Sequence, residues 1–158
     1  MPKEWVDRND RIAGDCPAGP VEDDEPVARL LASRMWVDNK LQDCTFEREH
    51  LIPPKNGAIN NEPGQRDGES LIRNKDVPDA TLVALSAAKP TTAGAAIFDL
   101  AAIRQIVAAD DASRRMFRVY EDPTDELPQH AVIRFAGKGR PEWYVARSQL
   151  LMTMARKI

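Results

Sequence analysis

Two segments of alternating polar and apolar residues in the last third of the chain constrain its fold more than any other feature. They are residues 116–120 (MFRVY) and 130–135 (HAVIRF), separated by the polar loop EDPTDELPQ. A period of two is typical of a strand with one buried face. We therefore expect two strands that lie side by side, with their apolar residues facing one core.

The alternation places four polar side chains on the face opposite to that core: Arg118, Tyr120, His130 and Arg134. Two guanidinium groups and an imidazole are the chemistry of a surface that binds phosphate or carboxylate. The loop between the strands adds Glu121, Asp122, Asp125 and Glu126, and an acid beside a histidine can act in general acid–base catalysis. The same pattern is typical of the solvent face of an antiparallel sheet. Both interpretations remain open at this point.

Further strands and helices are expected along the rest of the chain. The remaining strand candidates are a segment ending at Ile52, residues 69–73 (ESLIR), which could pair with that segment, and residues 95–98. Apolar residues at helical spacing predict helices over residues 25–37, 76–89, 100–109 and 140–158, with Asp99 as the N-cap of the third. The sequence thus predicts an α+β domain in which a small, mainly antiparallel sheet of four to five strands packs with three to four helices.

Residues 1–25 differ in composition from the rest, because they hold eight acidic and three basic residues together with several prolines and glycines. This composition favours a flexible acidic N-terminal arm, followed by a single domain over residues 26–158. Residues 53–68 consist almost entirely of turn-forming residues, which predicts a long loop.

Composition and motifs argue against several classes of function. The net charge of −3 argues against a general nucleic-acid-binding protein. No apolar run is long enough to span a membrane, and the N-terminus lacks a signal-peptide pattern, so a cytoplasmic location is expected. Cys16 and Cys44 show no metal-ligand spacing with the two histidines, and nucleotide-binding motifs are absent, so no metal or cofactor is expected. Ser70 and Ser86 lie in no G-x-S-x-G motif, so no catalytic residue is assigned.

The favoured interpretation of function is a non-enzymatic accessory or adaptor protein that binds a larger protein partner. Long polar loops and a basic C-terminal third opposite the acidic arm fit such a role. The candidate contact residues are Asn56 and Gly57 in the 53–68 loop and Trp143 and Tyr144 in the last helix, since aromatic residues anchor interfaces. The aromatic pair could equally belong to the core. The alternative function is an anion-binding protein or enzyme that uses the Arg118/Tyr120/His130/Arg134 face on a phosphate- or carboxylate-bearing substrate.

Four short motifs resemble those of a group of small uncharacterised bacterial proteins. They are a leading Leu-rich helix over 27–35, LIPPKNG at 51–57, ESLIR at 69–73, and HAVI at 130–133 ahead of a final helix. Residues 58–68 look like an insertion between the proline loop and the next strand. No activity is attached to that group, so the resemblance implies no catalytic residue. It implies a bacterial source and an accessory role beside larger proteins.

Overall fold

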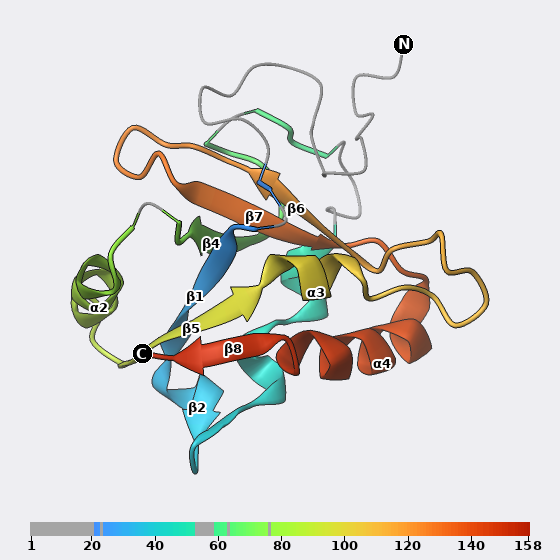
Figure 1. Ribbon diagram of the computed structural model, residues 1–158, viewed down its shortest axis with the longest axis horizontal. Helices are drawn as coiled ribbons and strands as arrows, with labels where there is room; N and C mark the ends of the chain where they lie inside the picture. Colours follow the sequence, from blue (N-terminus) through green and yellow to red (C-terminus); the bar gives the residue numbers. More distant parts are fainter. Residues whose placement is uncertain (1–20, 23, 53–58, 63, 76) are drawn as a thin grey trace.

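The computed structural model describes residues 21–22, 24–52, 59–62, 64–75 and 77–158. Within this part of the chain, six strands form an antiparallel sheet in the order β6-β7-β4-β1-β5-β8 (Figure 1). Their bounds are β1 Pro26–Ala32, β4 Glu69–Arg73, β5 Thr92–Asp99, β6 Phe117–Glu121, β7 His130–Phe135 and β8 Met154–Lys157. β2 (Trp36–Val37) and β3 (Lys40–Leu41) form a separate hairpin. The helices are α1 Arg48–Leu51, α2 Asp79–Ala87, α3 Leu100–Arg104 and α4 Gly139–Leu151. The predicted α+β class is confirmed.

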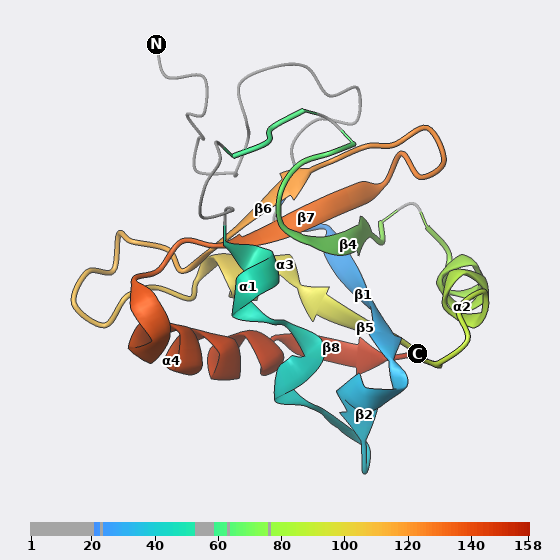
Figure 2. The same ribbon diagram turned by 180° about the vertical axis from the view of Figure 1, so that it is seen from behind.

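The sheet separates two hydrophobic clusters. Figures 1 and 2 show α2 and α4 on opposite sides of the molecule. The larger cluster joins one face of the sheet to residues of α1, α3 and α4, and the smaller joins the other face to Leu82 of α2. In the larger cluster the rings of Phe117, Phe135 and Trp143 contact one another, with centroids 5.2 to 6.3 Å apart. These aromatic contacts fix α4 against the β6–β7 end of the sheet.

The two alternating segments pair as the sequence predicts. β6 and β7 are antiparallel, with Val119 opposite Ile133 and Arg118 opposite Arg134. The apolar set that was assigned to the core, which includes Phe117, Val119 and Ile133, is buried. The strand at residues 69–73, the strand containing residues 95–98 and the helix before Pro90 are also present. The Ala102 N–H donates to Asp99 Oδ1 at 3.3 Å, so Asp99 caps α3 as expected.

The helix expected over residues 25–37 is wrong, because residues 26–32 form strand β1. β1 lies between β4 and β5 and has apolar neighbours on both faces. Val27 and Leu31 belong to the larger cluster, whereas Ala28 belongs to the smaller one. A strand buried on both faces loses its alternation, and its apolar residues then fall at spacings that also fit a helix.

The helix expected over residues 100–109 ends at Arg104, and two other predicted elements are wrong. The strand expected to end at Ile52 is a 3₁₀ turn followed by the short helix α1, and β4 pairs with β1 and β7 rather than with this segment. The helix expected to reach residue 158 ends at Leu151, and the chain turns into the edge strand β8. Met154 packs on the larger cluster and Ile158 on the smaller. They therefore lie on opposite faces of the sheet, not on one helical stripe.

Residues 1–20 and 23 of the predicted arm lie outside the described residues. At its C-terminal end, Val21 and Glu25 are buried. The Glu25 carboxylate accepts two bonds from the Arg73 guanidinium, at 2.9 and 2.7 Å. This pair joins the segment before β1 to β4. None of the described helices is long and apolar enough to cross a membrane.

Candidate functional site

Three polar side chains from different elements meet on the face of the sheet that carries α2. β4 and β7 are neighbours, with Ser70 opposite Val132 and Ile72 opposite His130. Ser70 and His130 are therefore diagonal neighbours on the same face of the sheet. Asp122 follows the end of β6, and its N–H donates to the His130 carbonyl at 2.9 Å. The strand order thus brings together residues that are 60 and 8 positions apart in the sequence.

A continuous chain of hydrogen bonds joins these side chains, which we call the Ser70–His130–Asp122 triad. His130 Nε2 lies 3.1 Å from Ser70 Oγ, and His130 Nδ1 lies 3.0 Å from both Asp122 Oδ2 and the Asp122 carbonyl oxygen. Both Asp122 groups only accept hydrogen bonds, so Nδ1 must carry a proton. In the neutral imidazole Nε2 is then an acceptor, and the Ser70 hydroxyl must donate to it. The local contacts therefore fix which atom donates and which accepts in each hydrogen bond of the triad.

Burial differs along the triad. The Asp122 side chain is 2% exposed and that of His130 is 19% exposed, whereas Ser70 lies at the surface. The hydrogen bond to the Asp122 side chain raises the pKa of His130, and burial of the imidazole opposes this effect. The triad therefore runs from a buried carboxylate through a partly buried imidazole to an exposed hydroxyl.

The four residues that the sequence placed on one polar face do share that face, but hydrogen bonds divide them between two groups. His130 belongs to the triad. The Arg134 guanidinium stacks over the Tyr120 ring, 4.7 Å from its centroid, and donates to the carbonyls of Asp67 and Asn60 at 2.6 and 3.2 Å. Arg118 lies opposite Arg134 on β6. Arg134 therefore holds a loop, whereas His130 contacts Ser70 and Asp122.

That loop, which we call the strap, comprises residues 59–62 and 64–68 and crosses the face beside the triad. Gly64 and Arg66 donate their backbone N–H groups to Asp122 Oδ1, at 2.7 and 3.1 Å. Gly64 adopts a φ of 86°, and a Cβ there would lie 3.1 Å from the Pro123 carbonyl oxygen. Glycine at this position lets the strap approach the loop that carries Asp122.

The candidate partner-contact residues that the structure describes differ in burial. Trp143 is buried against Phe117 and Phe135, so the core interpretation holds for its ring. Tyr144 is half exposed. Asn56 and Gly57 lie outside the described residues.

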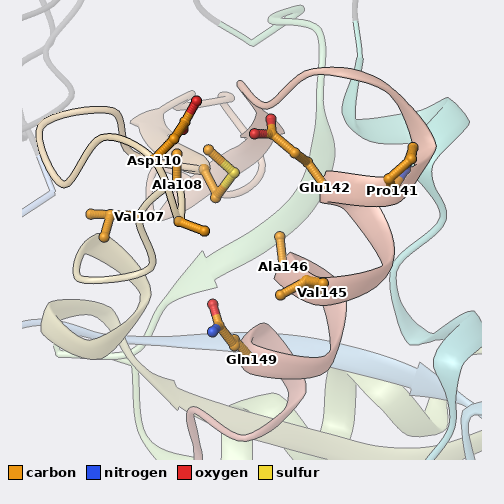
Figure 3. A pocket seen from close by; sticks show the side chains of 10 residues that line it. Val107, Ala108, Asp110, Pro141, Glu142, Val145, Ala146 and Gln149 are labelled. Atoms are coloured by element: carbon orange, nitrogen blue, oxygen red, sulfur yellow. The ribbon is translucent and has the colours of Figure 1, made fainter.

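An apolar groove lies on α4, away from the triad (Figure 3). Val107 and Ala108 line one side, Val145 and Ala146 line the other, and the volume is about 260 Å³. Val145 is 62% exposed, although the side chain is apolar. The groove is therefore a surface on which an apolar group could be buried.

The sequence interpretation missed Ser70 and did not single out Asp122 from its acidic neighbours. Asp122 was among the four acids considered as partners of His130. Ser70 lies in no G-x-S-x-G motif. That motif identifies the serine of one hydrolase fold, and its absence says nothing about a serine on a sheet strand. The alternation of side chains along a strand could have indicated it. Once β4 is paired with β7 in the observed register, Ser70 and His130 lie on the same face of the sheet.

No known protein family, curated protein sequence or solved structure matches this chain.

Proposed function

We propose that the protein is a serine-dependent hydrolase of the acyl-transfer type, in which Ser70 is the nucleophile and His130 the general base. The observation that carries the proposal is the direction of the hydrogen bonds in the Ser70–His130–Asp122 triad. Its hydrogen bonds point the Ser70 proton at the imidazole nitrogen that is free to accept it. Ser70 and His130 are the catalytic residues, and Asp122 is a positioning residue that acts through His130.

The reaction follows from these contacts. Ser70 Oγ attacks the carbonyl carbon of an ester while its proton moves to His130 Nε2. The ester C–O bond then breaks, and the alcohol leaves with the proton that His130 returns. Water attacks the acyl-serine by the same route: His130 takes one proton from the water, the serine–acyl bond breaks, and Ser70 recovers its hydrogen as the acid leaves.

The first prediction concerns p-nitrophenyl acetate, a small activated ester. With this activated ester we expect acylation of Ser70 to be faster than hydrolysis of the acyl-serine, so the protein should release a burst of p-nitrophenol equal to the concentration of the chain. Ser70→Ala should abolish the burst and lower the rate by about 10²–10⁴-fold. The matched control is Ser148→Ala, because Ser148 is an exposed serine whose hydroxyl donates to the Tyr144 carbonyl. An equal burst from the Ser70→Ala protein would contradict the proposal.

A second candidate function is the accessory or adaptor role, for which the groove on α4 is the supporting observation. Val145, which lines it, is 62% exposed, and Tyr144 on the same helix is 50% exposed. Exposed apolar side chains at a groove are typical of protein-binding surfaces. In this proposal the chain is an accessory subunit in the bacterial cytoplasm and buries Val145 against a larger protein.

The second prediction tests that role. The tagged chain, purified from its native host, should carry a larger protein in stoichiometric amount. Val145→Glu should lower the amount of that protein recovered about tenfold, which corresponds to a loss of roughly 1.4 kcal/mol in binding free energy. Val83→Glu is the matched control, because Val83 is an exposed valine on α2, 48% exposed. Equal recovery with both variants would exclude this groove as the binding surface.

A further inference from the structure

The carboxylate of Asp122 divides its two oxygens between two parts of the molecule. Oδ2 lies 3.0 Å from His130 Nδ1, whereas Oδ1 accepts the N–H groups of Gly64 and Arg66 at 2.7 and 3.1 Å. Since both oxygens are engaged, the carboxyl group cannot rotate about its bond to Cβ without breaking one set of bonds. The position of the strap therefore determines the direction in which Asp122 presents Oδ2 to the imidazole.

Two arginines hold the strap: Arg134, described above, and Arg66, whose side chain is 2% exposed. Its Nη1 donates to the Glu121 carbonyl and lies 3.2 Å from Glu121 Oε1, and its Nε donates to the Asn61 carbonyl at 3.0 Å. The guanidinium thus joins the strap to the end of β6, directly before Asp122. A planar group with several donors makes these contacts together, which the single ammonium of a lysine cannot do.

We propose that Arg66 is a positioning residue for His130, and that it acts through the strap and Asp122. Its catalytic consequence rests on the function proposed above, but its effect on the imidazole does not. Asp122 is the charged group that acts on the His130 imidazole. Arg66 of the strap forms an ion pair with Glu121, directly before Asp122, and Arg134 of β7 interacts electrostatically with Asp122 and with Asp67 of the strap. The uncharged groups that face the imidazole are the Ser70 hydroxyl and the Asp122 carbonyl.

The hydrogen bond to the Asp122 side chain is the first cause of the raised pKa of His130, and Arg66 supports that bond because it helps to hold the strap against Asp122. Arg66→Lys tests this support without changing the net charge, because lysine loses the multiple hydrogen bonds. Gly64→Ala tests it independently, because it changes no charge and forces a Cβ against the Pro123 carbonyl.

The test is an NMR pH titration of the His130 imidazole in the full chain. The midpoint should lie above the ordinary histidine value in the unaltered protein and move to lower pH in both Arg66→Lys and Gly64→Ala. Arg34→Lys is the control, because Arg34 is 62% exposed, and it should leave the midpoint unchanged. If Arg66→Lys does not fold, Gly64→Ala decides the question.

An unchanged or raised His130 midpoint in the folded variants would overturn the positioning role. If Ser70 also forms an acyl intermediate, its acylation rate should fall by up to about 10²-fold in the same variants, because misplaced catalytic groups lose rates of this order. The titration reports on His130 even if Ser70 does not react. Failure of the proposed chemistry and failure of the positioning role are therefore separate results.

Discussion

Replacing His130 with glutamine should lower the rate at which p-nitrophenyl acetate acylates Ser70 by about 10²–10⁴-fold. Glutamine is polar and close in size, but its amide does not accept a proton at neutral pH. The burst phase in rapid-mixing experiments measures this step alone. His50→Gln is the matched control, since the imidazole of His50 pairs with Glu69 and takes no part in the triad. Equal acylation rates in the His130→Gln and unaltered proteins would remove His130 from the mechanism.

The pH dependence of the same step follows from the raised pKa of His130, whose first cause is the bond to Asp122. The protonated imidazole cannot accept the Ser70 proton. Acylation should therefore increase with pH and level off above the pKa of His130, with a midpoint above the ordinary histidine value of 6.5. Asp122→Asn removes the charge that raises this pKa, so the midpoint should move to lower pH. A midpoint unaffected by Asp122→Asn would contradict the assigned hydrogen-bond chain.

Replacing Phe117 with alanine should lower the free energy of unfolding by about 3–5 kcal/mol at 25 °C. Phe117 is fully buried, and its ring contacts those of Phe135 and Trp143. Removing the ring leaves a cavity between the sheet and α4 that these large neighbours cannot fill. Urea unfolding followed by tryptophan fluorescence measures the change.

The control for this variant is Tyr144→Ala, which removes an aromatic ring on α4 that is half exposed. Its expected effect is under about 1 kcal/mol, since exposed substitutions away from special contacts change stability little. Similar losses in both variants would contradict the assignment of Phe117 to the core and of Tyr144 to the surface.

The part of the fold that could be predicted depends on local patterns with a single buried face. β6 and β7 alternate because one face packs on α4 while the other carries Tyr120, His130 and Arg134. Asp99 was predictable as a cap because its carboxylate needs only the N–H of a residue three positions later. Both signals lie within a few residues of sequence, so neither needs the tertiary structure.

The elements that could not be predicted are those whose environment is set by distant parts of the chain. β1 is central, and the burial of Ala28 on one face and Leu31 on the other erases its alternation. β8 forms because residues 154–157 find an open edge at β5, although the preceding helix could continue on pattern alone. Tertiary pairing overrides local periodicity in both cases.

The site shows the same division. His130 and its acidic neighbours were visible in the sequence because Asp122 lies only eight residues before His130. Ser70 was not, because its approach to His130 requires β4 to enter the sheet beside β7. The pairing of β4 with β7 needs a glycine at position 68, because a Cβ there would lie 2.8 Å from the Ile133 carbonyl oxygen. Neither that strand order nor this close approach is encoded in a short motif.

The most direct test of the central claim is covalent trapping of the nucleophile. The full chain, treated with a fluorophosphonate, is digested, and the modified peptide is sequenced by tandem mass spectrometry. The account predicts one phosphonate adduct on Ser70, formed faster as the pH rises through the pKa of His130 and lost in His130→Gln. An unmodified Ser70, or equal modification of the exposed Ser148, would contradict it.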